Sequence, residues 1–368
     1  MNRGTQRHCM NRIFKVALVG TGIGASHAVA FRALASQFAV TLICGQDPES
    51  AAKLADTFVA AGLERPVLTS DFRDATVTSD PIDIVDICLP PFLHEEAIRR
   101  ALEAGRHVIC EKPLVGSLRE MDELAGLAAR VGRRLMPVFQ YRFGNGLAKA
   151  KHLMASGAAG KIYLASIETH WTRGANYYAE RWRGRKKTEL GGVLTSHAIH
   201  AHDMLAHLVG DVRAVAAMTS VRVNDVETED CAGALMEMAD GSLAVSSATL
   251  GSADEISRLR ICCENVTMMS NLAPYAPHLE PWIFLPKAPR TDEFIARALA
   301  DAPAGPEGYA AQFARLHDSL TTGGELPVTL EQGRKSIELL TAIYHSARTG
   351  ERVALPIGRE HPAYAGWN

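Results

Sequence analysis

The sequence predicts an α/β protein with a parallel, doubly wound sheet in its first part and an α+β region with a large, mostly antiparallel open sheet in its second part. Three observations lead to this fold class. Apolar runs rich in Val and Ile alternate with helical stretches up to about residue 140. These runs are apolar throughout, which is typical of strands covered on both faces. Beyond residue 150, longer strand-like runs follow one another without helices between them, as in antiparallel sheets.

The elements of the first part follow from the switch between these two patterns. Its strand candidates are 13–20, 40–44, 82–90, 107–113 and 134–140. Its helical stretches are 25–37, 48–61, 94–105 and 117–132. Strands that alternate with helices form a parallel sheet. We therefore predict a first domain over 13–140, preceded by a flexible tail at 1–12.

The second domain is predicted over 141–368. Its strand-like runs are 161–171, 212–223, 231–250 and 257–269, and its first helical stretch is 192–209. Asp240-Gly241 lies inside one of these runs and predicts a hairpin, because such turns need a positive φ. The remaining segments are a Pro- and Ala-rich stretch at 271–307, expected to be a loop, and expected helices at 308–321 and 329–348.

Length, charge and cysteine content limit the class of protein. A chain of 368 residues is too long for one ordinary core and indicates about two domains. The net charge of −2 gives no long-range attraction to nucleic acid or to an anionic membrane, and no apolar run approaches the ~18 residues of a membrane span. Seven cysteines without a C-x-x-C pair indicate reduced thiols and a cytoplasmic protein. The basic N-terminus lacks an apolar stretch, so a secretory signal is not expected.

A glycine-rich turn joins the first strand to the first helix. Gly20, Gly22 and Gly24 occur in "VGTGIGASH" with the spacing G-x-G-x-G, one residue tighter than G-x-G-x-x-G. Backbone N–H groups at a helix N-terminus bind the pyrophosphate of a dinucleotide when no side chain blocks its approach. Because the turn follows a strand and begins a helix, a dinucleotide site is favoured over a tight turn without a ligand.

The second strand ends without the acidic residue that commonly binds the adenosine ribose of NAD. Gly45 occupies that position, and Asp47 follows two residues later. We expect Asp47 to cap the helix that Pro48 begins rather than to bind ribose. The missing acid removes one obstacle to the 2′-phosphate of NADP, but no arginine replaces it. The predicted cofactor is therefore NAD or NADP.

A lysine lies at the end of the strand candidate 107–113, on the edge where ligands bind in open parallel sheets. It belongs to the triplet Glu111-Lys112-Pro113. Together with "GTGIGASH", "LPPFLHEEAIRRALEAGRHVICEKP", "QYRF", "ELGGVLTSHAIHAHDMLAHLVG" and "AIYHSARTGERVALP", this triplet resembles the glucose–fructose oxidoreductase / inositol dehydrogenase / rhizopine-catabolism (Gfo/Idh/MocA) family. The resemblance extends from Val16 to about Pro356.

The resemblance implies an NAD(P)-dependent oxidoreductase that transfers a hydride between nicotinamide and a sugar, polyol or related hydroxy compound. It places Lys112 between nicotinamide and substrate, where a cation stabilises a developing alkoxide; the alternative is a surface lysine at a strand end. It also implies a homo-oligomer, a dimer or tetramer, formed through the open sheet. The residues predicted to contact the cofactor are Gly20, Thr21, Gly22, Ile23, Gly24, Gly45, Gln46, Leu89, Pro90, His94, Glu111, Lys112 and Gln140.

The segment "LTSHAIHAHDMLAH", residues 194–207, carries four histidines and an aspartate. The resemblance assigns His200 as the acid/base of a D-x-x-x-H-x-x-D pattern. Asp203 matches the last aspartate, and Ser196 replaces the first. Oxidation of an alcohol needs a base for the hydroxyl proton, and histidine titrates near neutral pH. We expect His200 to act with Lys112.

Because Ser196 brings no carboxylate, either His200 works with Lys112 alone, or His197, Thr195 or a water assists it. No metal site is predicted here, since the histidines do not follow H-E-x-x-H and a third ligand is missing. His202 should point away from His200 and is expected at a helix face or an interface. His207 is expected to be structural.

Further side chains suit a sugar substrate, because arginine and aromatic groups contact hydroxyls, carboxylates and sugar faces. The predicted substrate contacts are Arg142, Trp171, Arg173, Arg183, Ser196, His197 and His200. Lys186 and Lys187 are expected to face solvent. His94 is expected either at the cofactor edge or at the start of a helix, and Glu111 is expected to support Lys112.

Two other functions stay open. A relative of the family could use NAD transiently for net hydrolysis, elimination or epimerisation, and the absence of an aspartate at Ser196 keeps this alternative open. A nucleotide-dependent sensor without catalysis ranks last, because such a protein should lack Lys112 or His200, and both are present.

Overall fold

The structure is a computed structural model that describes residues 12–78 and 80–367. The chain divides into two compact units. Unit 1 contains the residues up to Val115, Glu120–Val138 and Tyr309–Gly333, and unit 2 contains Gly116–Arg119, Phe139–Gly308 and the residues from Arg334 onward. The predicted limits 13–140 and 141–368 are linear, whereas the units exchange segments. Residues 1–11 of the predicted tail, with Cys9, lie outside the described residues.

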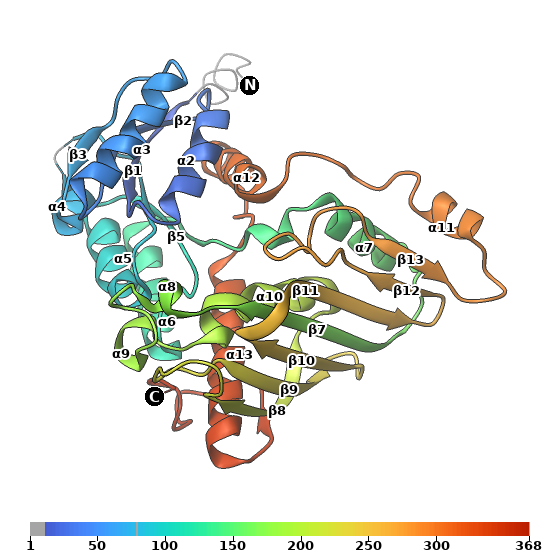
Figure 1. The fold of residues 1–368 in the computed structure, drawn as a ribbon. Helices are drawn as coiled ribbons and strands as arrows, with labels where there is room; N and C mark the ends of the chain where they lie inside the picture. The colour runs from blue at the N-terminus through green and yellow to red at the C-terminus, as the bar shows by residue number, and fades with distance from the viewer. Residues whose placement is uncertain (1–11, 79, 368) are drawn as a thin grey trace. The chain divides into compact units, whose positions relative to one another are not determined.

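Unit 1 contains a sheet of six parallel strands in the order β3-β2-β1-β4-β5-β6 (Figure 1). The strands are β1 (Phe14–Val19), β2 (Phe38–Cys44), β3 (Val67–Thr69), β4 (Ile84–Ile87), β5 (His107–Cys110) and β6 (Leu135–Pro137). The doubly wound parallel sheet is confirmed. Only β3 is absent from the predicted strands. Its three partly exposed residues are too few to show the alternation of apolar and polar side chains that identifies a strand.

Apart from the short helical elements at 72–77 and 91–93, which were not predicted, the helices of unit 1 begin near the predicted positions. They are α2 (Gly24–Ala33), α3 (Pro48–Ala60), α4 (Phe72–Val77), the 3₁₀ turn η1 (Pro91–Leu93), α5 (His94–Glu103), α6 (Leu118–Val131) and α12 (Gly308–Thr322). Asp47 caps α3 by accepting the backbone N–H of Ser50 at 3.0 Å, as predicted. Phe313 of α12 stacks on Phe31 of α2 with ring centroids 4.8 Å apart. This contact explains why a segment near the end of the chain belongs to unit 1 (Figure 1).

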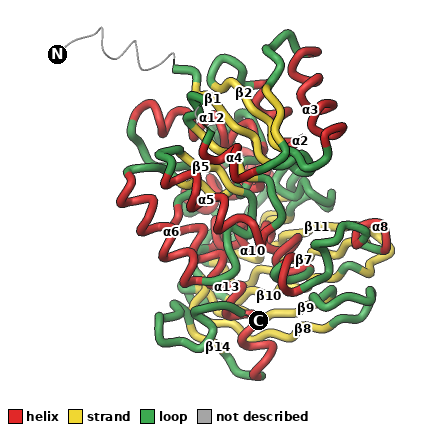
Figure 2. The backbone as a smooth tube through the Cα atoms, turned by 90° about the vertical axis from the view of Figure 1, so that its left-hand side faces the viewer, coloured by secondary structure: helices red, strands yellow, loops and turns green. Residues whose placement is uncertain are grey.

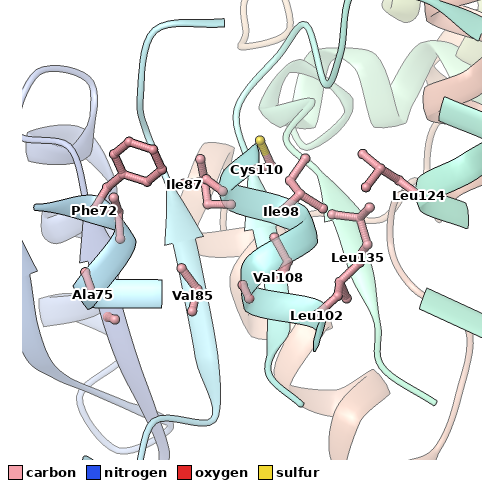
Figure 3. Close-up of a cluster of buried hydrophobic side chains, with 14 of the residues drawn as sticks. Phe72, Ala75, Val85, Ile87, Ile98, Leu102, Val108, Cys110, Leu124 and Leu135 are labelled. Atoms are coloured by element: carbon pink, nitrogen blue, oxygen red, sulfur yellow. The ribbon is translucent and has the colours of Figure 1, made fainter. Parts of the chain in front are cut away.

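The core of unit 1 lies between the central strands and α5 (Figure 3). Val85 of β4 and Val108 of β5 are at most 2% exposed. Ile98 and Leu102 of α5 are fully buried beside them. Each such side chain contributes roughly 1.5–3 kcal/mol through burial. These strands are therefore apolar along their whole length because they pack against buried side chains of this kind.

Unit 2 contains a sheet of eight strands in the order β13-β12-β11-β7-β10-β9-β8-β14. The strands are β7 (Ile162–Thr172), β8 (Val212–Ser220), β9 (Cys231–Met238), β10 (Leu243–Thr249), β11 (Gly251–Cys263), β12 (Val266–Met269), β13 (Ile283–Pro286) and β14 (Val353–Ala354). Only the neighbours β7 and β10 run parallel. Figure 2 shows β11, β7, β10, β9 and β8 side by side. The mostly antiparallel open sheet is confirmed, and Gly241 adopts the predicted positive φ, 86°.

The expectation of a loop over 271–307 is wrong. This segment contains β13 and the helix α11 (Asp292–Ala298). The strand β13 ends at a proline and lies at the edge of the sheet. Edge strands tolerate proline because they need fewer ladder hydrogen bonds. The Pro and Ala content of this segment therefore did not indicate the strand β13.

Helices cover one face of this sheet. They include η2 (Gln140–Arg142), α7 (Asn145–Ala155), α8 (Ala175–Tyr178), α9 (Lys186–Glu189), η3 (Leu194–Ala198), α10 (Ile199–Val209) and α13 (Leu330–Thr349). His202 of α10 lies with its Nε2 2.8 Å from the Ser246 hydroxyl of β10. Ser346 of α13 accepts the backbone N–H of Ala217 in β8 at 2.9 Å. Over residues 12–78 and 80–367, no helix combines the length and apolar character needed to cross a membrane.

A buried group of charged residues lies in unit 1. The His27 ring is fully buried, with Nδ1 2.8 Å from Asp86 Oδ2 and Nε2 3.1 Å from Glu111 Oε1. Burial works to lower the pKa of His27, but the charges and hydrogen bonds of Asp86 and Cys88 raise that pKa well above its usual value. Burial raises the pKa of Asp86, and His27 opposes this shift. The ring is therefore held as an imidazolium between two carboxyl groups.

We predict that this group makes the folded chain less stable as the pH rises. With its raised pKa, folded His27 keeps a proton that the unfolded chain releases near pH ~6.5. Its contribution is complete below that pH and is lost as the pH rises through the folded-state pKa. Replacement of His27 by Asn leaves buried carboxylates unpaired and should cost about 3–5 kcal/mol at pH ~6. Thermal denaturation should show this difference shrinking toward pH ~9.

His94 provides the control, because burial lowers its pKa. Its contribution should be lost as the pH falls below ~6.5, so His94→Asn should show the opposite slope. Parallel stability curves for the wild-type chain and His27→Asn would contradict the assignment.

Candidate active site

The glycine turn after β1 combines one crowded position with one open position. Gly20 has φ +107°, and a Cβ at this residue would lie 2.3 Å from the carbonyl oxygen of Cys88. A Cβ at Gly22 would meet no atom within 4 Å, whereas at Gly24 it would make an ordinary contact with Leu18 at 3.4 Å. Gly20 therefore serves the fold. Gly22 leaves the space before α2 open, which fits a dinucleotide pyrophosphate at the helix N-terminus.

Gly45 is explained by packing between the end of β2 and the glycine turn. A Cβ at this position would lie 2.6 Å from Thr21 Cγ2 and 3.2 Å from Ala51 Cβ. No acidic side chain fits there while Thr21 keeps its place. Gln46 is exposed next to it. The cofactor contacts predicted for Thr21, Ile23, Gly45 and Gln46 stay predictions.

His94 lies at the start of a helix, one of its two predicted places. It begins α5 and is 1% exposed. Its two ring nitrogens lie 2.8 Å from the carbonyl oxygens of Leu89 and Pro113. The helix-start prediction is therefore confirmed, whereas the cofactor contact stays a prediction. The ring joins the turn after β4, with Leu89 and Pro90, to the segment that follows β5.

Lys112 follows β5 at the carboxyl edge of the parallel sheet, the same edge that carries the glycine turn. The neighbouring Glu111 is 4% exposed. Glu111 Oε2 accepts the backbone N–H of Lys112 at 3.1 Å. Its Oε1 lies 3.1 Å from His27 Nε2 and accepts the hydroxyl of Tyr309 at 3.3 Å. Glu111 thus has the geometry of a support for Lys112, as expected. Sequence analysis missed Tyr309, which comes from α12.

The group His27, Asp86 and Cys88 also has ligand atoms within 4.8 Å of one another, as a metal site requires. However, His27 Nδ1 lies at hydrogen-bonding distance from Asp86, and an imidazolium has no lone pair to offer a metal. We interpret this group as a hydrogen-bonded network.

His200 lies in α10 of unit 2 and is 6% exposed. Its ring stacks on Tyr141 with centroids 4.6 Å apart. The predicted helix is confirmed as one helical run over residues 193–209, in which Leu194–Ala198 is π-helical and continues directly into α10. Such π-helical segments are frequent at functional sites. Lys112 belongs to unit 1 and His200 to unit 2, so their joint role stays a prediction.

Arg142 pairs with an aspartate of the helix that carries His200. Its Nε and Nη2 donate to the two carboxylate oxygens of Asp203 at 2.8 and 2.6 Å. Both side chains are nearly inaccessible, at 5% and 2% exposure. This bidentate pair anchors α10 to the turn η2, which carries Tyr141 and Gln140. Arg142 therefore positions the helix of His200, and its predicted substrate contact stays a prediction. The predicted cofactor contact of Gln140 stays a prediction.

The remaining histidines of the segment have separate partners. His202 contacts Ser246, which confirms its expected place at an interface within the fold. His207 Nε2 lies 2.9 Å from Lys151 Nζ, and His197 lies 4.8 Å from Trp171 between ring centroids.

Ser196 is linked to a carboxylate that sequence analysis missed. Its hydroxyl donates to Glu189 Oε1 at 2.8 Å. Glu189 is 1% exposed, and its Oε2 accepts the backbone N–H of Gly184 at 2.5 Å. The guanidinium of Arg183 lies over the Tyr177 ring at 3.8 Å and 3.5 Å from Glu189 Oε1. No motif reveals Glu189, because the fold of residues 177–196 brings it to Ser196.

Trp171 is buried, at 2% exposure, and supports other groups. Arg173 lies over its ring at 5.0 Å, donates to the hydroxyl of Tyr275 and pairs with Glu255 at 2.6 Å. A direct substrate contact of Trp171, as predicted, would require these groups to move. Arg173 and Arg183 stay predicted substrate contacts. Lys186 and Lys187 are exposed, as expected.

Comparison with known families gives matches in both units. A family described as "Oxidoreductase family, NAD-binding Rossmann fold" matches residues 14–139. The "GFO/IDH/MocA C-terminal domain" of the same family matches residues 147–269. Levoglucosan dehydrogenase of Pseudarthrobacter phenanthrenivorans is 34% identical over 216 residues, which cover 56% of this chain and 53% of that protein.

Another relative is 2,7-anhydro-N-acetylneuraminate hydratase of Escherichia coli, 28% identical over 53% of this chain and 49% of that protein. The chain thus spans about half the length of these curated relatives. Among solved structures, the WlbA dehydrogenase of Bordetella pertussis, in complex with NADH and UDP-GlcNAcA, has a TM-score of 0.80 and 26% identity. It covers 94% of this chain and 100% of its own. Because both parts of one family match in order along both units, the chain belongs to the Gfo/Idh/MocA oxidoreductase family and carries its NAD-binding Rossmann domain.

Proposed function

We propose that this protein is an NAD-dependent dehydrogenase that oxidises a hydroxyl group of a sugar, polyol or related hydroxy compound. The observation that carries the proposal is the carboxyl edge of the parallel sheet, which presents both the open position at Gly22 and Lys112 with its supported backbone. The levoglucosan dehydrogenase relative and the NADH complex of WlbA support a sugar hydroxyl and NAD.

In the proposed oxidation, Lys112 acts as a cation and His200 acts as a base. When bound at the glycine turn, NAD would supply the acceptor for the hydride of the alcohol carbon. The ammonium of Lys112 stabilises negative charge on the substrate oxygen while the hydride leaves. His200 takes the hydroxyl proton, so one alcohol and one NAD⁺ become one carbonyl compound, one NADH and one proton. The Arg142–Asp203 pair and the stacked Tyr141 limit the orientations of the His200 ring.

A second candidate is net elimination, hydration or epimerisation, with NAD reduced and reoxidised within one turnover. Ser196 in place of an aspartate and the relative named as a hydratase favour it. Stoichiometric release of NADH during turnover would exclude this alternative, whereas turnover without NADH release would support it.

We predict that Lys112→Met abolishes oxidation while the chain still binds NAD. Loss of the cation should lower kcat by roughly 10²–10⁴-fold. The measurements are NADH formation with a sugar and polyol panel and the Kd for NAD by calorimetry. Lys187→Met, at an exposed lysine of unit 2, is the control and should keep full activity. Full activity of Lys112→Met would refute the role of Lys112.

We predict opposite effects for two neighbouring glycines. Gly22→Val should leave the thermal midpoint close to that of the wild-type chain, because the position is open. It should weaken NAD binding by about tenfold or more, equivalent to ~1.4 kcal/mol. Gly20→Ala should instead destabilise the fold by roughly 1–3 kcal/mol, because of its positive φ and the contact with Cys88. Unchanged NAD affinity in Gly22→Val would contradict the proposed cofactor position.

We also propose a homo-oligomer, a dimer or tetramer, formed through the uncovered face of the unit 2 sheet. Along β10, Ala244 and Ser246 are buried toward the helices, whereas Val245 is 41% exposed. Its cross-strand partner Leu235 is 52% exposed, and Met218 of β8 is 80% exposed. Apolar groups that form such a continuous face mark an interface more often than a solvated surface.

We predict that Leu235→Lys combined with Val245→Glu lowers the mass in solution to that of one chain, as measured by analytical ultracentrifugation. Val59→Lys is the control, because Val59 is a 50% exposed apolar residue of unit 1, and it should not change the mass. An unchanged mass of the double variant would place the interface elsewhere.

We further propose a reducing, cytoplasmic location. The six cysteines of the described residues, Cys44, Cys88, Cys110, Cys231, Cys262 and Cys263, are free thiols, which supports this location.

A further inference from the structure

A cluster of aromatic rings and arginines lies beside the turn that precedes His200 in unit 2. We call it the saccharide cluster, and its members are Arg173, Tyr177, Arg183 and Tyr275, with Trp171 beneath them. Tyr177 lies 5.5 Å from His197 between ring centroids. Ser196, on the same turn as His197, donates to Glu189. The cluster therefore extends to the helix that carries the predicted base.

Tyr275 is the most accessible ring of the cluster, at 56% exposure. It packs on Trp171 with centroids 4.3 Å apart, and its hydroxyl accepts from Arg173. Its φ of 64° lies in the left-handed region, which costs a residue other than glycine about 1–3 kcal/mol. Trp171 and Arg173 thus hold an exposed aromatic face in a disfavoured conformation. Such local strain is characteristic of binding sites.

The charges of the cluster are balanced in pairs. Arg173 pairs with Glu255 at 2.6 Å, and Arg183 lies 3.5 Å from Glu189. The backbone N–H of Thr172 and the guanidinium of Arg173 lower the pKa of Glu255. Burial raises the pKa of Tyr177 and also raises that of Tyr275. Together with Glu189 and Glu255, the two arginines and the neutral phenols of the cluster thus carry no net charge.

We propose that the saccharide cluster binds an uncharged sugar ring and discriminates against sugars that carry a carboxylate or phosphate. A sugar ring packs its C–H face on Tyr275, and its hydroxyls exchange hydrogen bonds with the paired arginines and carboxylates. A substrate anion would have to compete with Glu189 and Glu255 for arginines that they already neutralise. Like charges brought together at such a site cost several kcal/mol. This inference rests on the proposed function and specifies the class of its substrate.

The test compares matched neutral and acidic sugars: glucose with glucuronate, and galactose with galacturonate. Binding to the full-length protein saturated with NADH is measured by calorimetry and by tryptophan fluorescence, so no turnover is needed. The neutral member of a pair should bind at least ~10-fold more tightly than the acid. Tyr275→Ala should weaken binding of the neutral sugar by about tenfold, because it removes the exposed aromatic face.

A charge variant tests the balance directly. Glu255→Gln leaves Arg173 without its carboxylate and should shift the preference toward the acid by about tenfold. Glu168→Gln removes the carboxylate of the Arg258–Glu168 pair on the same sheet and is the control that should leave the preference unchanged. Circular dichroism confirms that each variant is folded.

Tighter binding of the acids to the wild-type protein, an unchanged preference in Glu255→Gln, or no binding by any of these sugars would overturn the proposal. Neutral sugars that bind as expected without NADH formation from any substrate would uphold the cluster but refute the dehydrogenase. NADH formation together with tighter binding of the acidic sugars would uphold the dehydrogenase but refute the proposed role of the saccharide cluster.

Discussion

The contacts of the buried Glu111 carboxylate hold together the segments that meet at the carboxyl edge of the parallel sheet. This carboxylate connects the helix of the glycine turn through His27, the end of β5 through the backbone of Lys112, and α12 through Tyr309. A buried ion pair is weak evidence for stability, because desolvation offsets its attraction, but removal of one partner is expensive. The network therefore specifies the position of the Lys112 backbone more than it adds to the free energy of unfolding.

Steric limits around the glycine turn complete this edge. Gly20 and Gly45 exist because other protein atoms occupy the places where their Cβ atoms would lie. Gly22 has no such neighbour among the described residues, which fits the proposed approach of a pyrophosphate to the backbone. One motif thus contains glycines with different physical causes, and geometry separates them.

Unit 2 distributes the polar residues of one helical segment among different tasks. Asp203 anchors the helix through Arg142, and His202 fastens it to the sheet through Ser246. His200 and His197 pack against aromatic rings toward η2 and the saccharide cluster. The crowding of histidines in this segment therefore follows from the many surfaces that a central helix meets, and it does not indicate a shared metal.

The sequence by itself determined the alternation of strands and helices, the glycine turn and the cap at Asp47. It also determined the place of Lys112 after a strand, at the carboxyl edge of the parallel sheet. These features depend on neighbours in the chain, on periodic burial and on local backbone requirements, all of which composition and spacing record.

Only the tertiary structure decided the roles that depend on residues far apart in the chain. It paired Arg142 with Asp203, turned His94 toward two backbone carbonyls and brought Glu189 to Ser196. It also placed α12 in unit 1 and revealed β13. The physical reason is that a side chain's partner is set by the packing of distant elements, and no local pattern in the sequence carries that information.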